Sequence, residues 1–374
     1  MSIVVKEISS GKDIKQFINF PNDLYKGDKN YVPELYLNIS EVLSRKKNPF
    51  FQHSDAKLFL AYKNDKIVGR IAFVKDNNYN AYHECNIGFF GFFDVINEFE
   101  VATALLDEAA KHARENGFDR ILGPTNFTTN DTAGMLVEGY DRPPTVMMTY
   151  NKPYYNELVT RYGFGKEMDM YAYFIPSKDA NEKSLRLASM LSERLSRKGI
   201  TIRNIYKKKL NDELMIIKDI YKSAWEKNWG FVPPTDAEFN HLAEGLKLLI
   251  DKRYVFMAEK DGVPIGFGAA IPNINEITKD FKKGKLLPFN IFKLLIGKKK
   301  TNKIRIILLG VKEEYRKLGI EGVMFAKYIQ AARDNGLEGG EASWILESNE
   351  MMVKAAENLN GSRTHTFRIY SKTL

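Results

Sequence analysis

The sequence predicts an α/β (α+β) protein of two similar domains in tandem, each a mixed, mostly antiparallel sheet flanked by helices. Three observations support this prediction. The chain has 374 residues, which is long for one domain. Each half contains a hairpin pattern followed by an apolar strand pattern. In each half a helix then ends in nearly the same residues, "KHARENG" and "QAARDNG". An internal duplication is the simplest explanation of this matched order.

The expected elements follow the same order in both halves. Each half begins with a strand and two helices, and Asn211 and Thr235 stand where helix N-caps are expected in the second half. A hairpin follows, with Asn64-Asp65 at its turn in the first half and Asp261-Gly262 in the second. The next strands, "NIGFFGFFDV" and "IRIILLGV", are continuously apolar, as is typical of strands buried on both faces. A helix, a strand, a helix and a final strand complete each half.

A polar, amphipathic stretch between Pro176 and Gly199 separates the halves, and Gly199 supplies a helix stop. We expect a first domain over residues 1–176, a helical connector over 177–199 and a second domain over 200–374. An insertion at about 272–303 interrupts the second domain, and its basic clusters flank an apolar, helix-like run. An interfacial helix, a lid over the site and a solvated basic insertion are the open alternatives for it.

Charge and residue composition limit the partners, the cross-links and the metal sites that the protein is expected to have. The net charge is +9 and the pI about 9.2, which suits an anionic partner but gives no firm signal for nucleic acid. A single cysteine, Cys85, excludes an internal disulfide and fits a reducing compartment. The five histidines show no metal-ligand spacing, so no metal is expected. We see no signal peptide and no transmembrane run, and we expect a cytoplasmic protein whose oligomeric state is open.

The stretch "VKEEYRKLGIEG", from Val311 to Gly322, joins the apolar strand of the second half to a helix. Gly319 permits close backbone approach, and the first amides of a helix lack intrahelical acceptors. Together with the helix dipole and the positive charges of Arg316 and Lys317, they predict a site for a phosphate or pyrophosphate. The Gly-Lys-Ser/Thr ending of a phosphate-binding P-loop is missing. A glycine-containing helix start with solvated basic residues is the alternative.

The order of elements, with Arg316-x-x-Gly319 after the fourth strand, resembles the GNAT superfamily of acyl-coenzyme A-dependent N-acyltransferases. Across the whole chain, phrases such as "FINFPNDLYKGDKNYVPEL" and "GPTNFTTND" resemble bacterial tandem GNAT proteins. The resemblance implies that the loop amides hold the pyrophosphate of coenzyme A and that the preceding strand lies along its pantetheine arm. The residues implied to contact coenzyme A are Leu309, Gly310, Val311, Arg316, Lys317, Leu318, Gly319, Ile320, Glu321, Gly322 and Asn349. Glu321 departs from the family pattern, in which glycine or alanine is usual.

The resemblance also implies that an acceptor amine attacks the thioester directly, with a strand amide near Gly310 or Val311 facing the oxygen. Glu347, at the end of the fifth strand, is the candidate general base, and an exposed strand-end glutamate is the alternative. Ala356 occupies the position of the family's tyrosine, a common general acid. The general acid is therefore not assigned, and Tyr370 on the last strand and Tyr328 on the preceding helix are the substitutes for it.

The corresponding helix start of the first half has no glycine and no basic residue, and Glu98 and Glu100 would repel a phosphate there. We therefore expect a first domain that is GNAT-like in fold but degenerate for coenzyme A. The predicted function is an acyl-CoA-dependent N-acyltransferase (acetyltransferase) that uses acetyl-CoA or another acyl-CoA and an unidentified amine. The alternatives are a Fem-like aminoacyl transferase that uses aminoacyl-tRNA, and a non-catalytic GNAT-fold binding protein.

Overall fold

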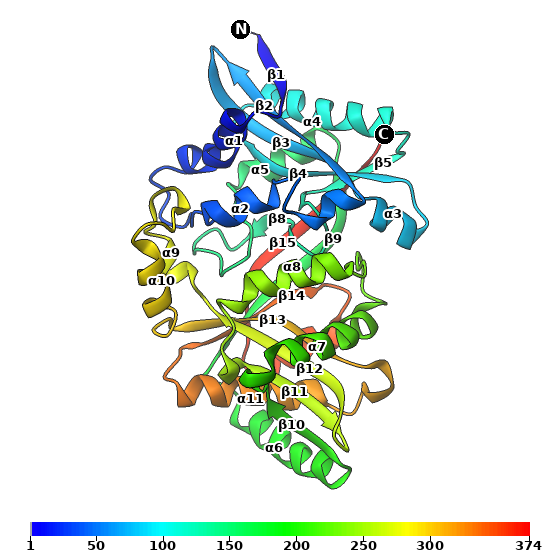
Figure 1. Cartoon of the computed structure of the whole chain (residues 1–374), viewed down its shortest axis with the longest axis vertical. Helices are drawn as coiled ribbons and strands as arrows, with labels where there is room; N and C mark the ends of the chain where they lie inside the picture. The colour runs from blue at the N-terminus through cyan, green and yellow to red at the C-terminus, as the bar shows by residue number, and fades with distance from the viewer. Residues whose placement is uncertain (1) are drawn as a thin grey trace. The chain divides into compact units, whose positions relative to one another are not determined.

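The computed structural model describes residues 2–374, which form two compact units (Figure 1). Unit 1 comprises residues 2–169, Ile277–Lys293 and His365–Leu374, and unit 2 comprises Met170–Glu276 and Leu294–Thr364. Each unit contains a mixed, mostly antiparallel sheet with helices packed against it. This arrangement confirms the predicted fold class.

The sheet of unit 1 is antiparallel except where its fourth and fifth strands run parallel. Its strands, in spatial order, are β1 (Ile3–Ile8), β2 (Asp55–Lys63), β3 (Lys66–Lys75), β4 (Ile87–Val95), β5 (Arg120–Gly123) and the end of β15 (Ser362–Thr373). Beside it lie the short strands β6 (Thr125–Asn126), β7 (Thr132–Ala133) and β8 (Met135–Glu138). Every residue of β4 is buried, as its continuous apolar sequence predicts.

Helices cover both faces of this sheet. They are α1 (Gly11–Leu24), α2 (Tyr36–Val42), α3 (Asn77–His83), α4 (Phe99–Glu115), α5 (Tyr154–Arg161) and the 3-10 turn η1 (Pro49–Gln52). Leu105 of α4 packs on Gly69, whereas the next residue, Arg70, donates a hydrogen bond of 2.9 Å to the Phe17 carbonyl of α1. Neighbouring residues of a strand point to opposite faces, so α4 and α1 lie on opposite sides of β3.

Unit 2 repeats the plan. Its strands, in spatial order, are β10 (Ile200–Asn204), β11 (Val255–Lys260), β12 (Val263–Pro272), β13 (Lys303–Val311), β14 (Gly339–Leu346) and the end of β9 (Gly165–Pro176). Its helices and 3-10 turns are α6 (Glu182–Arg197), η2 (Lys207–Lys209), α7 (Leu210–Trp225), α8 (Asp236–Lys247), η3 (Lys252–Tyr254), η5 (Glu313–Tyr315), α11 (Ile320–Asp334) and α12 (Glu350–Glu357). Trp225 of α7 packs on Phe267 of β12, and Tyr328 of α11 lies against the next residue, Gly268. The two helices therefore cover opposite faces.

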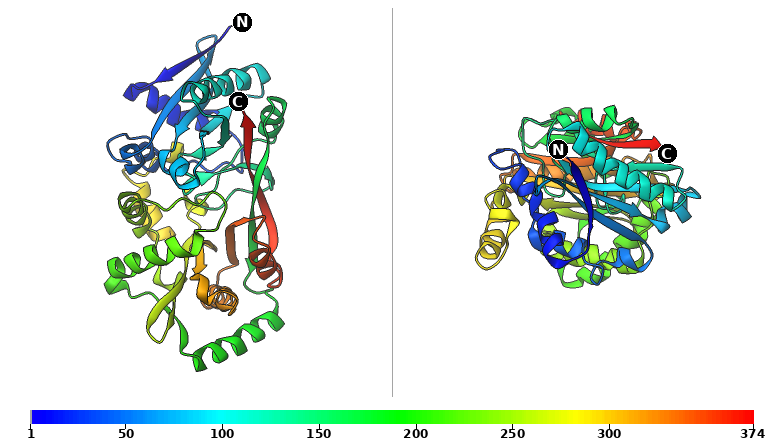
Figure 2. Two further views of the ribbon diagram at one scale, coloured as in Figure 1. Left: turned by 90° about the vertical axis from the view of Figure 1, so that its right-hand side faces the viewer. Right: turned by 90° about the horizontal axis from the view of Figure 1, so that it is seen from above.

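The last strand of each half of the sequence completes the sheet of the other unit. Residues 170–176 of β9 pair with β14 in unit 2, from Met170 opposite Leu346 to Pro176 opposite Gly339. The end of β15, the red strand at the C-terminus in Figure 2, belongs to unit 1. It pairs there with β5, and Tyr370 lies opposite Gly123. Neither unit is therefore made of one continuous half of the chain.

The insertion contains α9 (Asn275–Thr278), the turn η4 (Lys282–Gly284) and α10 (Asn290–Gly297). Residues Ile277–Lys293 of this segment belong to unit 1. Within residues 2–374, no helix combines the length and the apolar character needed to cross a membrane.

Both predicted hairpin turns and one of the two predicted N-caps are confirmed. Asn64, Asp65, Asp261 and Gly262 all have positive φ, between 50° and 83°, as expected of tight hairpin turns. Thr235 caps α8, and Glu238 completes a capping box with it. The predicted cap at Asn211 is wrong, because α7 already begins at Leu210. The 3-10 turn that precedes it leads directly into the helix, so Asn211 lies inside the first helical turn.

Candidate active site

The parallel strands β13 and β14 separate part of the way along their length. Their ladder runs only from Lys303 opposite Gly339 to Ile306 opposite Ala342, after which β14 continues its pairing with β9. Residue 307 is also skipped in the pairing of β13 with β12, which marks a bulge. Residues 307–309 are accordingly half-buried, between buried neighbours on both sides. This open stretch of β13 offers main-chain groups to an extended ligand that carries amides.

The open stretch leads into the loop that the sequence singled out. After η5 the backbone is extended at Arg316 and left-handed at Lys317 and Gly319, with φ of 66° and 80°. The first bond from α11 back to the loop runs from the Val323 N–H to the Gly319 carbonyl at 3.2 Å. The amides of residues 320–322 therefore precede the regular hydrogen-bond pattern of α11, and no side chain caps the helix. Amides and helix dipole together favour an anion here.

Arg316 fixes the shape of the loop. Its Nη2 donates to the Ala224 carbonyl at 2.5 Å and its Nε to the Val311 carbonyl at 3.3 Å. The guanidinium thus ties the loop to the end of α7 and to the end of β13. Lys317 is exposed and its ammonium is the formal positive charge of the loop that faces solvent. Arg316 therefore shapes the loop of the candidate anion site through its contacts with the backbone.

The side chains of Leu191 and Glu321 also affect the surroundings of the helix start. A Cβ on Gly319 would lie 2.5 Å from the end of the Leu191 side chain on α6, whereas a Cβ on Gly322 would meet no atom within 4 Å. Gly322 therefore leaves open space beside the amides. Burial raises the pKa of the Glu321 carboxyl, although its own backbone N–H and Arg316 act in the opposite direction. The raised pKa keeps the carboxyl neutral to a higher pH than that of an exposed glutamate, and only its ionised form would repel a pyrophosphate.

Glu347 and Asn349 lie just beyond the end of β14, in the same unit as the loop. Glu347 is half-buried. Asn349 is the N-cap of α12, and its side-chain oxygen accepts a hydrogen bond of 3.3 Å from the Met352 N–H. Ala356, at the position of the family's tyrosine, is completely buried. These positions leave Glu347 as the titratable side chain next to the end of β14.

The two candidate tyrosines occupy different environments. Tyr370 belongs to unit 1, where it is 1% exposed in the core and its hydroxyl donates to the Asn156 side-chain oxygen at 2.8 Å. Burial raises its pKa. Tyr328 lies in unit 2 in a small cavity between α11 and the sheet, and its hydroxyl has no hydrogen-bond partner within residues 2–374. Burial raises its pKa well above the usual value. Their role as proton donors stays a prediction.

Unit 1 has the same separation of strands, but its own chain fills the opening. The ladder of β4 with β5 ends at Phe89 opposite Leu122. The Thr125 carbonyl then approaches Gly91 so closely that a Cβ there would lie 1.8 Å away. Asn126 accepts a hydrogen bond of 2.7 Å from the Phe92 N–H through its side-chain oxygen. These contacts close the strand opening of unit 1, and its lack of coenzyme A binding stays a prediction.

The sequence did not reveal the contacts of two of these residues, Leu191 and Asn126. Leu191 was part of the predicted connector helix, and only its amphipathic spacing hinted that one face of α6 packs on a neighbour. Asn126 lies in a polar stretch whose sequence gives no sign of what it fills. Across residues 2–374 the structure has no group of three or more His, Cys, Asp or Glu side chains that could hold a metal ion.

Comparison with known proteins finds relatives that match nearly the whole chain. The family model for the Acetyltransferase (GNAT) family matches residues 24–133 and 214–360, one segment in each half. Protein YghO of Escherichia coli K12 is 34% identical over 377 residues, which cover 99% of this chain and 95% of that protein. A bacterial ceramide synthase of Caulobacter vibrioides is 33% identical over 374 residues, which cover 98% of this chain and 96% of that protein.

Solved structures share the tandem architecture. A tandem GNAT protein from the clavulanic acid biosynthesis pathway superposes with a TM-score of 0.59 at 10% identity, covering 100% of this chain and 98% of that one. A GCN5-related glucosamine N-acetyltransferase region of a fungal β-N-acetylglucosaminidase gives a TM-score of 0.57 at 15% identity, covering 99% and 38%. At these identities the likeness concerns the fold. With both halves matched by the family model, the chain belongs to the GNAT family of acetyltransferases, as its sequence resemblance predicted.

Proposed function

We propose that the protein is an acyl-CoA-dependent N-acyltransferase whose reaction takes place in unit 2. The observation that carries this proposal is the separation of β13 from β14 directly before the glycine start of α11. The pantetheine arm would lie along residues 307–309 and exchange hydrogen bonds with the open strand. The pyrophosphate would lie against the amides of residues 320–322, next to Lys317.

The proposed reaction needs no covalent enzyme intermediate. The amine nitrogen attacks the thioester carbonyl carbon, a C–N bond forms, the C–S bond breaks, and coenzyme A leaves as a thiolate that takes up a proton. A strand amide near Gly310 or Val311 would stabilise the oxyanion. Glu347 would accept the proton that the amine loses, directly or through water. Tyr328, which belongs to unit 2, would donate the proton that the thiolate takes up, whereas the other substitute, Tyr370, is buried in the core of unit 1.

We further propose that the acceptor is a long-chain amino alcohol. The support is the ceramide synthase of C. vibrioides, which is related over nearly the whole length of both chains. A ceramide is the amide of a fatty acid with such an amino alcohol, so its synthesis requires the reaction described above. The acyl donor would then be a fatty acyl-CoA, and acetyl-CoA is the short-chain comparison.

Calorimetric titration of the protein with palmitoyl-CoA and with acetyl-CoA tests the proposed acyl-CoA site. Gly319→Trp places an indole on the proposed phosphate site, and Gly322→Trp does so from a helical position with open space around it. Gly336→Trp is the matched control, because Gly336 has a similar positive φ at the other end of α11. We expect both test variants to weaken binding about tenfold or more and the control to bind like the wild type. Unchanged affinity in both test variants would remove the loop from the proposal.

Turnover is best followed by mass spectrometry of the amide, because thiol reagents would also react with Cys85. Acyl-CoA is supplied with sphinganine, with a short alkyl amine and with lysine. If only sphinganine gives an amide product, the result supports the proposed acceptor. If another amine gives an amide product, the proposed acceptor is wrong and that class of amine replaces it. Binding without any amide product favours the non-catalytic alternative. Salt-sensitive binding of aminoacyl-tRNA, without acyl-CoA binding, favours the Fem-like alternative.

A further inference from the structure

The insertion exposes a compact group of apolar side chains. Leu287, Phe289, Phe292 and Ile296 have exposed fractions of 68%, 75%, 62% and 63%, and they are four of the five most exposed large hydrophobic side chains in residues 2–374. Phe292 and Ile296 are four residues apart in α10 and share one face of it, whereas Leu287 and Phe289 lie in the turn that precedes the helix. Leu294, on the opposite face of α10, is buried. We call Leu287, Phe289 and Phe292, which all belong to unit 1, the apolar face of the insertion.

The part of the insertion that precedes this face is anchored to unit 1. Phe281 is buried, and Gly284 lies so close to the Glu34 carbonyl that a Cβ would be 1.8 Å from it. Lys283 forms an ion pair of 2.9 Å with Asp23. Within the segment, the Asn290 side-chain amide donates to the Lys285 carbonyl at 2.7 Å. The apolar face is therefore held outward by an ordered base.

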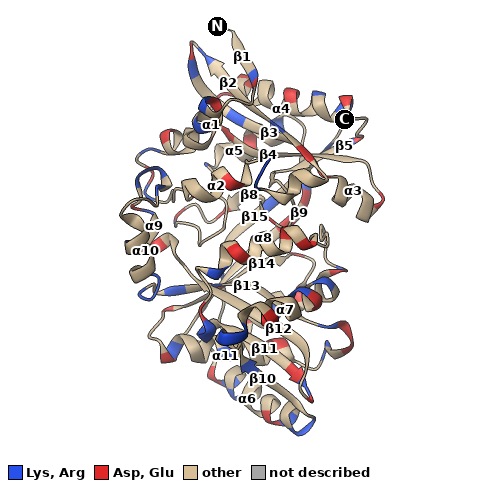
Figure 3. Cartoon of the chain, in the orientation of Figure 1, with Lys and Arg blue, Asp and Glu red and all other residues tan. Residues whose placement is uncertain are grey.

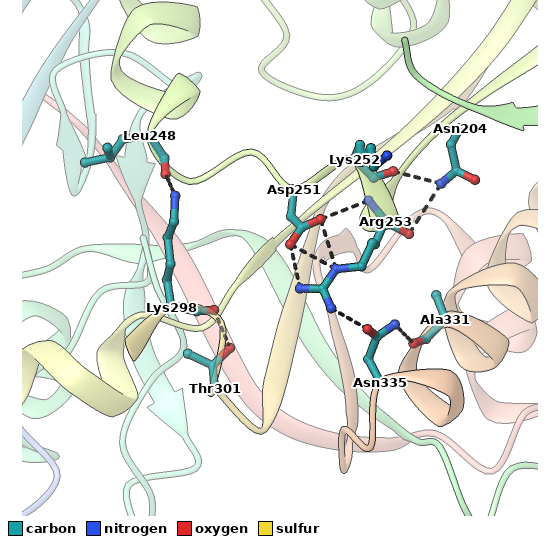
Figure 4. Close-up of polar contacts among 9 residues, drawn as sticks. All are labelled: Asn204, Leu248, Asp251, Lys252, Arg253, Lys298, Thr301, Ala331 and Asn335. Atoms are coloured by element: carbon teal, nitrogen blue, oxygen red, sulfur yellow. Dashed lines mark hydrogen bonds and ion pairs between the residues drawn. The ribbon is translucent and has the colours of Figure 1, made fainter. Parts of the chain in front are cut away.

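The same segment concentrates positive charge. Residues 272–303 contain nine lysines and two acidic residues, which gives this segment a net charge of +7 in a chain of net charge +9. Within the segment, no acidic residue follows Asp280. Figure 3 shows the charged residues along the chain. Lys282, Lys285 and Lys293 are exposed and flank the apolar face along the chain. Lys298 is engaged elsewhere, since its ammonium donates to the Leu248 carbonyl within unit 2 (Figure 4). The exposed lysines thus stand before and after the aromatic and aliphatic residues in the sequence.

We propose that the apolar face docks onto an anionic lipid bilayer and lies in its interfacial region. Phenylalanine and leucine side chains would enter the boundary between headgroups and acyl chains, and the lysines would face anionic headgroups. At eight residues α10 is about 12 Å long, which suits a helix lying in the interface. A symmetric dimer through this face would bring the lysines of two copies together, so charge disfavours a second copy as the occupant. This inference concerns where the protein resides and is independent of the proposed function.

Vesicle flotation with the full chain tests the proposal without any substrate. Vesicles of pure phosphatidylcholine are compared with vesicles that contain phosphatidylglycerol. The variant Phe289→Ser/Phe292→Ser removes the two aromatic side chains, and Lys282→Glu/Lys285→Glu reverses two charges. The control Leu187→Ser/Met190→Ser removes two exposed apolar side chains of α6. Circular dichroism melting verifies that each variant is folded.

We expect the wild type to float with the anionic vesicles and the control to match it. The serine variant should lose about tenfold or more of its partitioning, and the charge reversal should lose a similar factor on anionic vesicles only. The proposal is overturned if the wild type floats with neither vesicle, or if the serine variant partitions like the wild type. It is also overturned if vesicle binding is absent and sedimentation shows that the wild type forms a dimer, or a complex with an acidic protein, whereas the serine variant is a monomer.

Discussion

Arg368 donates two charge-assisted hydrogen bonds to the Asp169 carboxylate, from Nε to Oδ1 at 2.7 Å and from Nη2 to Oδ2 at 2.9 Å. Asp169 lies on β9 and Arg368 on β15, so the pair joins two strands that are 199 residues apart in the sequence. Lys166 adds an ion pair of 3.0 Å to the same carboxylate. Burial raises the pKa of Asp169, but the hydrogen bonds from Arg368 and Lys166 outweigh burial and bring the pKa below its usual value.

Asp169→Asn should lower the free energy of unfolding at pH 7 by about 2–3 kcal/mol, because Arg368 would lose its partner in a site where the Asp169 side chain is only 8% exposed. Since the folded-state pKa is lowered, the stabilisation is present above the unfolded pKa of 3.8 and is lost as the pH falls through the folded value. The wild type and the variant should therefore converge in acid. Urea denaturation at neutral and acidic pH measures both effects.

The exposed ion pair of Lys354 with Glu350 supplies the control for this prediction. Glu350→Gln should change stability by less than about 0.5 kcal/mol at either pH. If Asp169→Asn destabilised the protein equally at all pH values, the charge of Asp169 would not be the source of the effect.

Deletion of residues 365–374 should destabilise unit 1 severely. The deletion removes the strand that pairs with β5 and takes the buried Tyr370 out of the core. An uncovered strand edge and an emptied core position favour aggregation. Size-exclusion chromatography and thermal melting should show loss of the cooperative, monodisperse protein. A soluble, cooperatively melting product would show that this strand is dispensable to unit 1.

Tyr370→Phe keeps the strand and removes only the hydroxyl that bonds to Asn156. We expect a loss of about 1 kcal/mol in the free energy of unfolding. Amide formation from acyl-CoA distinguishes a structural from a catalytic hydroxyl. A fall in kcat of about 100-fold with unchanged KM would support Tyr370 as the proton donor, whereas unchanged kcat would exclude it and direct the same test to Tyr328→Phe.

Asn126→Ala should cost about 1–3 kcal/mol of stability, because the Phe92 N–H would lose the acceptor that fills the strand opening of unit 1. Asn126→Asp keeps an oxygen at the same place and should recover most of this loss. Chemical denaturation compares the two variants. Neither should change the affinity for acyl-CoA, since the proposed site lies in unit 2. A change of affinity in both would contradict the assignment of the site to one unit.

Local features of this fold were predictable from the sequence because local chemistry determines them. The turn at Asp261-Gly262 requires left-handed backbone, which these residue types tolerate. Gly319 and the following amides likewise define a helix start whichever way the rest of the chain folds. The duplicated order of elements was visible for the same reason, since each element carries its own period of apolar residues.

Partners that are distant in the sequence were not predictable. The alternation in β9 and β15 identifies each as a strand but does not say which sheet it joins. Arg316 was expected to supply charge to an anion, and its bond to the Ala224 carbonyl, 92 residues away, carries no sequence signal. The burial of Glu321 depends on the packing of neighbouring elements and was equally hidden.

Glu321 should make acyl-CoA binding sensitive to pH. Burial raises the pKa of its carboxyl above the usual 4.5, so the group stays neutral to a higher pH than an exposed glutamate. As the pH rises through the raised pKa, the carboxylate forms beside the proposed pyrophosphate position and the affinity should fall. Glu321→Gln should bind about three- to tenfold more tightly than the wild type at neutral pH and lose this component of the pH dependence.

Calorimetric titration of both proteins across mildly acidic to neutral pH measures the difference directly. The phosphates of the ligand also titrate in this range, but they do so equally for both proteins, so the ratio of the two dissociation constants reports on residue 321 alone. Glu350→Gln, at the exposed start of α12, supplies a second carboxylate removal that should leave the ratio flat. A ratio that did not vary with pH for Glu321→Gln would mean that the Glu321 side chain points away from the bound phosphates, and the family's glycine at this position would then need another explanation.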